Sequence, residues 1–262
     1  MKDVTIINSG FAYGGFTSGS EGIWTRNEPT DPPAPDYKSL SERLRTPVSH
    51  IVRPYQAGGG KAAVVSSENG GSGVIKDSAF KKTDGLVTAE KGLVLSIISA
   101  DCVPVYLVDK YAGVVGLLHC GWRSAAGPLL KDAVGLMKGL GSVPGDIQVY
   151  IGPHICADCY EVGAEVREVY AHAFTEKELE KIFIARGNSL YLSLSQAIRS
   201  KAENEGIPDE NISVSEECTC HDPEFYSFRR GDRGRQNLAY IMINTTEQGA
   251  ENNVPVQNTF KS

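Results

Sequence analysis

The sequence lacks several features that would place it in a specialised class of protein. No apolar run approaches the roughly 18 residues that cross a bilayer, and the N-terminal "MKDVTIINSGFAYGG" is not typical of a signal peptide. Six cysteines among 262 residues are too few for a disulfide scaffold. The formal net charge is -6, and the one basic cluster, "FRRGDRGR", also contains Asp232. We therefore expect a cytoplasmic protein that binds neither membranes nor nucleic acid.

Apolar, β-branched runs alternate with amphipathic segments, which predicts an α+β fold of mixed sheets packed with helices. We expect a single domain over residues 1–244, in which 1–36 is largely irregular, and a polar tail over 245–262. Strands are predicted at 4–10, 50–56, 62–66, 93–99, 103–109, 112–119, 146–153, 212–219, 224–230 and 237–244. Helices are predicted at 37–45, 124–141, 163–174 and 193–207.

The stretch "GLLHCGWRSAAG" (116–127) lies between a predicted strand and a predicted helix. His119 ends the strand, Arg123 opens the helix, and such junctions commonly bind anions. If 103–109 and 112–119 form a hairpin, Asp101 and Cys102 lie at the same open end as His119. A Cys–His pair is compatible with a zinc site or an activated thiolate. It is equally compatible with a buried cysteine beside a structural histidine.

The segment "SADCVPVYLVDKYAGVVGLLHCGWRSAAG" resembles the signature of the laccase-domain family, also called multicopper polyphenol oxidoreductases. Members of this family are now described as zinc-dependent purine nucleoside phosphorylases with adenosine deaminase activity. Further matches follow in order: "TDGLVT" (83–88), "YIGPHICADCYEVG" (150–163), "VSEECT" (214–219) and "FYSFRRGDRGRQNLAYI" (225–241). The resemblance also implies a distant likeness of fold to Cys–His toxin deamidases.

The resemblance implies a zinc site of one cysteine and two histidines, and this chain retains two of the three ligands. Cys102 and His119 match the family's positions, but the other histidine falls on Gly58, which has no side chain. We therefore expect a divergent member whose zinc is weakly bound or absent. Copper is not expected, because five scattered histidines cannot build a multicopper centre.

Other family positions are partly kept. The family's Asn-Arg pair falls on Asp36 and Tyr37, and its "DLxxAN" pattern places Ser193 and Ile198 at the Asp and Asn. The retained residues are Asp101, Cys102, His119, Trp122, Arg123, Arg229, Arg230 and Arg235. Of these, Cys102, His119 and Asp101 are the expected catalytic residues. Arg123, Arg229, Arg230 and Arg235 are the expected substrate- and phosphate-binding residues.

These residues favour a purine nucleoside phosphorylase-like enzyme that takes a purine nucleoside and phosphate, with possible adenosine deamination. The alternatives are a Cys–His hydrolase or deamidase and a non-catalytic paralogue that binds a nucleotide-like ligand. The chain is expected to be a monomer or homodimer. Cys156-x-x-Cys159 and Cys218-x-Cys220-His221 have the spacing of a separate closed zinc site. We favour buried or loop thiols there over a structural zinc site, because the family commonly has cysteines at 159 and 218 without such a site.

Overall fold

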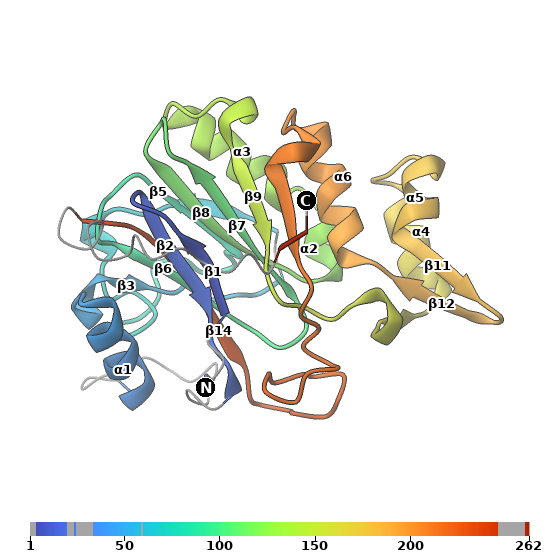
Figure 1. Ribbon diagram of the computed structural model, residues 1–262, viewed down its shortest axis with the longest axis horizontal. Coiled ribbons are helices and arrows are strands. Elements are labelled where there is room, and N and C mark those ends of the chain that lie inside the picture. The colour runs from blue at the N-terminus through green and yellow to red at the C-terminus, as the bar shows by residue number, and fades with distance from the viewer. Residues whose placement is uncertain (1–3, 20–23, 25–33, 59, 246–259, 262) are drawn as a thin grey trace.

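The computed structural model describes residues 4–19, 24, 34–58, 60–245 and 260–261, and its architecture is α+β (Figure 1). The described helices are α1 (Pro35–Leu44), α2 (Trp122–Ala126), α3 (Leu129–Gly139), α4 (Ala164–Ala171), α5 (Glu176–Ile182) and α6 (Leu194–Asn204). The described strands are β1 (Val4–Asn8), β2 (Ala12–Phe16), β3 (Ile51–Val52), β4 (Ala62–Val64), β5 (Gly85–Thr88), β6 (Val94–Ser99), β7 (Val103–Asp109), β8 (Val114–Cys120), β9 (Gln148–Ile151), β10 (Glu161–Val162), β11 (Phe183–Arg186), β12 (Ser189–Leu192), β13 (Ile212–Ser215), β14 (Asn237–Ile243) and β15 (Phe260–Lys261). No described helix is long and apolar enough to cross a membrane.

The described strands form three sheets. The largest has the order β15-β13-β9-β7-β8-β5-β4, a second has the order β1-β2-β14-β6-β3, and a small one has the order β10-β12-β11. The small sheet and helices α4 and α5 lie at one end of the molecule (Figure 1).

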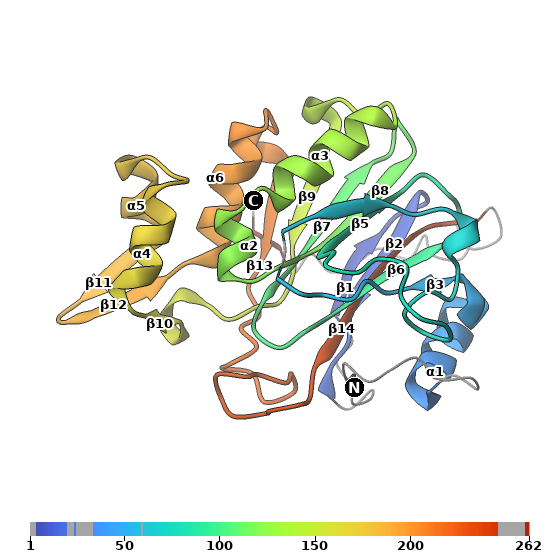
Figure 2. The same ribbon diagram turned by 180° about the vertical axis from the view of Figure 1, so that it is seen from behind.

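The long apolar runs of β7 and β8 are explained by burial on both faces of the seven-stranded sheet. Val105 and Leu107 pack in a core with α3 and α6, whereas Tyr106 and Val108 face the five-stranded sheet. Figure 2 shows α2, α3 and α6 lying across the outer face of the large sheet. Helix α1 covers the far side of the five-stranded sheet. The core is therefore layered as helices, sheet, sheet and helix.

Several sequence predictions of elements were wrong. The helix predicted at 124–141 is two helices, because Gly127 ends α2 and Pro128 precedes α3. The strand predicted at 224–230 is a series of turns. Strands β5, β11 and β12 and helix α5 were not predicted.

The irregular segment predicted at the N-terminus contains two strands, β1 and β2, which pair antiparallel. The remainder of that prediction falls mainly on 20–23 and 25–33, outside the described residues, as do 246–259 of the predicted polar tail. The end of the tail contributes β15, which pairs antiparallel with β13.

Candidate active site

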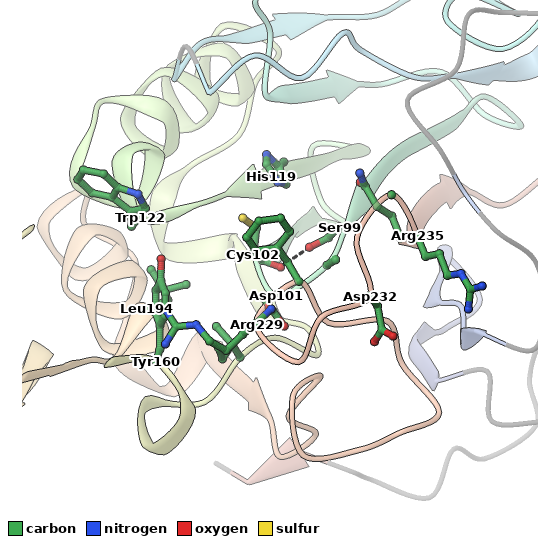
Figure 3. Close-up of a pocket in the computed structure, with 15 residues that line it drawn as sticks. Ser99, Asp101, Cys102, His119, Trp122, Tyr160, Leu194, Arg229, Asp232 and Arg235 are labelled. Atoms are coloured by element: carbon green, nitrogen blue, oxygen red, sulfur yellow. Dashed lines mark hydrogen bonds between the residues drawn. The ribbon is translucent and has the colours of Figure 1, made fainter. Parts of the chain in front are cut away.

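Cys102 and His119 line one cavity of about 380 Å³ at the end of the β7–β8 hairpin. In the hairpin register Val103 is opposite Cys120 and Pro104 is opposite His119, so Cys102 lies beside the end of β8. In Figure 3 the Cys102 sulfur lies toward the His119 ring. The hairpin therefore brings together two residues that are far apart in the sequence.

Asp101 shapes the backbone that presents Cys102. Its φ of 85° lies in the left-handed region, which is rare for a residue other than glycine. One carboxylate oxygen accepts the Thr219 hydroxyl at 2.7 Å, and the other accepts the Arg229 backbone N–H at 2.7 Å. The Ser99 hydroxyl donates to the Cys102 carbonyl oxygen at 2.5 Å. With both oxygens engaged, the Asp101 carboxylate ties the Cys102 turn to two neighbouring loops.

Asp84, which the sequence reasoning did not single out, orients His119. Its Oδ1 lies 3.4 Å from His119 Nδ1, and the carboxylate is fully buried. Burial raises the pKa of Asp84, but the contact with His119 and the N–H groups of Gly60 and Gly58 outweigh it and hold the pKa below its usual value. The only sequence signal for Asp84 was its place in the "TDGLVT" match.

The charge environment of His119 favours its protonated form. Burial lowers the pKa of His119, but its interactions with Cys102 and with the Asp84 carboxylate together outweigh burial and raise the pKa to about 9. The residue is 8% exposed, so these interactions are little screened by solvent. Cys102, His119 and Asp84 thus form a continuous array, with the imidazole between sulfur and carboxylate.

Gly58 lies beside this array. Its N–H donates to Asp84 Oδ1 at 3.1 Å, and the Gly60 N–H donates to Oδ2 at 3.1 Å. Gly58 has a φ of 67°, and a Cβ built there would meet nothing within 4 Å. The position of the missing histidine is therefore open space, connected to His119 through a shared carboxylate.

The donor set around Cys102 and His119 does not fit a catalytic zinc ion. Such sites normally have three protein ligands. Among the described residues, the one group of three or more convergent metal-ligating side chains contains neither Cys102 nor His119. His154 does not supply the third ligand, because it does not line the cavity and its Nδ1 bonds to the Gly152 carbonyl oxygen at 2.8 Å.

Two of the four arginines expected to bind substrate line the cavity. Arg229 and Arg235 do so, whereas Arg123 and Arg230 do not. Arg229 donates to the carbonyl oxygens of Cys159 and Glu161, at 3.1 and 3.0 Å. In Figure 3 the guanidinium of Arg235 points away from Cys102.

The other two arginines serve the surrounding structure. The Arg123 guanidinium carbon lies 3.9 Å from the ring centroid of Trp122, which does line the cavity. Arg230 donates to the backbone carbonyls of Thr219 and Asp222 and to the carboxylate of Asp232. Its guanidinium therefore holds a loop, and its expected role in phosphate binding stays a prediction.

Flat and apolar side chains form another side of the cavity. Trp122, Tyr160, Leu194 and Phe228 line it, and sequence reasoning had not identified the last three. Burial raises the pKa of Tyr160 to about 12, so its hydroxyl stays neutral and is available as a hydrogen-bond donor. In Figure 3 Trp122 and Tyr160 lie on the opposite side of the cavity from Arg235 and Asp232.

Three of the other five cysteines converge with a histidine, and one of the three, Cys159, directly precedes Tyr160 in the chain. Ligand atoms of Cys156, Cys159, Cys218 and His221 all lie within 4.8 Å of one another. These residues, which we expected to be buried or loop thiols, thus form a group that could hold a metal ion.

Fold and cavity together define an α+β enzyme-like domain with a Cys–His–Asp array, and comparison with known proteins identifies the family. Residues 10–244 match the sequence model of the multi-copper polyphenol oxidoreductase laccase family, to which this chain belongs. It is 32% identical over 252 residues to purine nucleoside phosphorylase YlmD of Geobacillus stearothermophilus, covering 95% of this chain and 91% of that protein. It is 34% identical over 195 residues to adenosine deaminase RL5 of an unknown prokaryotic organism, covering 73% and 74%.

Solved structures show the same fold. The crystal structure of YlmD from Geobacillus stearothermophilus superposes with a TM-score of 0.78 at 31% identity, covering 89% of this chain and 92% of that one. The hypothetical protein YfiH of Bacillus licheniformis superposes with a TM-score of 0.78 at 27% identity, covering 89% and 93%.

Proposed function

We propose that this chain is a purine nucleoside phosphorylase that cleaves adenosine- or inosine-type nucleosides with phosphate. The observation that carries the proposal is the Cys102–His119–Asp84 array in a cavity of about 380 Å³ that aromatic side chains also line. The volume suits a small ligand, and Trp122 and Tyr160 offer flat surfaces to a purine. The names of similar proteins, purine nucleoside phosphorylase and adenosine deaminase, support the same class of substrate.

In phosphorolysis a phosphate oxygen forms a bond to ribose C1′ while the bond from C1′ to the purine nitrogen breaks. The electron pair of that bond leaves on the purine, which then takes up a proton. His119 is protonated at neutral pH because its pKa is about 9. We assign it the role of offsetting phosphate charge and supplying the proton, with Asp84 fixing the ring orientation. Arg229 adds positive charge on the wall that carries Tyr160.

Adenosine deamination is expected to be the weaker activity. It requires water to add to the purine ring, and an activated metal-bound water is the usual means in deaminases. The two retained ligands at Cys102 and His119 do not complete such a site. Phosphorolysis needs no activated water, because phosphate is itself the nucleophile.

The test is to incubate metal-analysed protein with inosine or adenosine and to separate the products by chromatography, with and without phosphate. We expect free base and ribose 1-phosphate only when phosphate is present. His119→Ala should lower kcat by about 100-fold or more. His172→Ala, an exposed histidine at the end of α4, is the matched control and should keep full activity. Folded protein that releases no base with phosphate present would contradict the proposal.

A Cys–His hydrolase or deamidase is a second candidate, because Cys102, His119 and Asp84 follow the order of nucleophile, histidine partner and orienting carboxylate. A nucleophilic Cys102 should be alkylated by iodoacetamide with loss of activity, and substrate should protect it. Cys102→Ser would abolish a thioester-forming reaction. The same variant should leave measurable phosphorolysis if phosphate is the nucleophile.

A further inference from the structure

Four potential metal ligands lie together on two chain segments that are distant in sequence. Cys156 and Cys159 come from one segment, and Cys218 and His221 from another. Each segment contributes two ligands three positions apart, as in closed zinc sites. The set is distinct from Cys102 and His119.

The ligand atoms lie close enough together to surround one ion. One ligand atom from each of the four residues lies within 4.8 Å of the others, and a tetrahedral zinc ion with bonds of about 2.3 Å to sulfur and 2.0–2.1 Å to nitrogen would hold its ligand atoms roughly 3.4–3.8 Å apart. His221 approaches two of the sulfurs through different ring nitrogens, with Nδ1 3.7 Å from Cys156 Sγ and Nε2 3.1 Å from Cys159 Sγ. Binding of one ion therefore requires a small turn of the imidazole, so that one nitrogen faces all three sulfurs.

Backbone geometry holds the sulfurs in place before any ion binds. The short helix η5 (Ala157–Cys159) turns the chain so that the Cys159 N–H donates to the Cys156 carbonyl oxygen at 3.1 Å. The Cys156 N–H donates to Cys218 Sγ at 3.2 Å, an arrangement that stabilises negative charge on sulfur. An isolated β-bridge between His154 and Cys218 fixes the two segments to each other.

We propose that Cys156, Cys159, Cys218 and His221 bind one structural zinc ion. Three thiolates and one imidazole select zinc over magnesium and calcium, because those two ions prefer oxygen ligands. With four protein ligands the site is closed, so its role is to hold the two segments together.

Positive charge lies beside the cluster on both segments. The guanidinium groups of Arg229 and Arg230 donate to the carbonyl oxygens of Cys159 and Cys220. Three thiolates around one zinc ion leave a net negative charge, which these two guanidinium groups would offset.

The position of the site gives the ion a specific consequence. Ile155 and Tyr160, which flank the first pair of cysteines, line the cavity. The second pair adjoins Thr219, whose hydroxyl bonds to Asp101. The zinc therefore stabilises the two segments that form this side of the cavity. None of its ligands lines the cavity itself.

The experiment measures bound metal by mass spectrometry after expression with zinc chloride and exhaustive dialysis. We expect one zinc per chain, lost in Cys156→Ser/Cys159→Ser and retained in Cys102→Ser and His119→Ala. Cys220→Ser is the matched control, since it removes a neighbouring sulfur outside the ligand set, and it should keep the metal. Cobalt substitution should give thiolate charge-transfer absorption that follows the same pattern.

Because the double variant could fail to fold, His221→Ala is the second test. Its side chain is exposed, and its loss should weaken zinc retention against a chromophoric chelator while the circular dichroism spectrum is unchanged. The proposal is overturned if the wild-type protein holds no zinc, or if its zinc is lost in Cys102→Ser and kept in the double variant. It is likewise overturned if protein purified under reducing conditions holds a Cys156–Cys159 disulfide in place of zinc. None of these measurements depends on nucleoside turnover.

Discussion

At the scale of single residues, Gly58 decides which chemistry the cavity supports. Gly58→His introduces the missing ligand into open space, and histidine tolerates a φ of 67° better than most residues. The left-handed conformation costs about 1–2 kcal/mol of stability. We expect an additional zinc per chain and a larger rise in adenosine deamination than in inosine phosphorolysis, because only deamination needs activated water.

Gly58→Ala is the control for this substitution, since it carries the backbone strain without a ligand. It should lower the melting temperature without adding metal. A folded Gly58→His protein that gains zinc and turns over neither nucleoside would show that other substrate-binding residues of the family are missing from this chain. Tyr37 and Ser193 are the residues to examine first. Tyr37 belongs to α1 and is buried in the core, and Ser193 caps α6, so both have structural roles in this chain.

Asp84 gives a prediction about pH. The pKa of His119 is about 9 in the folded protein and about 6.5 when unfolded. This raised pKa contributes stability that is fully present below pH 6.5 and is lost as the pH rises through 9. Asp84→Asn removes part of this stabilisation, so the pKa of His119 should fall. The difference in stability between wild type and variant should shrink above pH 9. Thermal unfolding from pH 6 to 9.5 measures the stability difference, and NMR titration of the His119 ring measures its pKa.

The control is Asp109→Asn, which alters another buried carboxylate, bonded to the N–H groups of Tyr111 and Ala112. It should leave the His119 titration unchanged. An unaltered His119 pKa in Asp84→Asn would mean that Cys102 alone sets it.

At the scale of elements, the sequence predicted best the strands that are buried on both faces. The strands predicted at 93–99, 103–109 and 112–119 match β6, β7 and β8 to within two residues, because burial on both faces demands continuous apolar runs. The segment 224–230 has the alternation of a strand, but the Arg230 side chain folds back and bonds to the carbonyl oxygen of Phe225 in the same segment. The pattern of apolar residues does not reveal this bond. The hairpin of β11 and β12 did carry a local signal, the Gly187-Asn188 turn.

Helix α5, which the sequence did not predict, depends on its N-terminal cap. Thr175 accepts the Glu178 N–H, and Glu178 accepts the Thr175 N–H at 2.7 Å. Thr175→Ala should cost about 1 kcal/mol of stability, seen as a lower melting temperature. Burial raises the pKa of Glu178, but its bonds to Thr175 and Asn204 outweigh burial and lower the pKa. The stabilising contribution of Glu178 is therefore present above its unfolded pKa and lost as the pH falls through the folded value.

The same melting experiment at acidic pH tests the linkage, because the gap between wild type and Thr175→Ala should narrow there. Thr175→Ser keeps the hydroxyl and should behave like wild type. A constant gap at all pH values would mean that Glu178 does not take part in the cap.

At the scale of the whole molecule, the cavity is built from segments that the sequence separates widely. The motifs pointed to Cys102 and His119, and spacing offered a zinc site at the other cysteines as one alternative. Spacing did not reveal that Asp84 lies beside His119, and it did not decide whether the two cysteine-containing segments meet. The reason is physical: both depend on pairing between distant segments, such as the bridge between His154 and Cys218. Local patterns encode burial and turns, whereas the cavity wall is a product of tertiary packing.

This architecture predicts a coupled response of the cavity wall to loss of metal. Without zinc, residues 153–160 and 217–230 should exchange amide hydrogens faster together, because the ion joins the two segments and Arg229 links both to Asp101. Strands β7 and β8 should keep their protection, since both faces of each strand are buried in the layered core. Hydrogen exchange followed by mass spectrometry on wild type and Cys156→Ser/Cys159→Ser measures this, with Cys220→Ser as the control. Faster exchange in only one segment would show that the cysteines do not join the two, and faster exchange throughout would show that the ion supports the entire core.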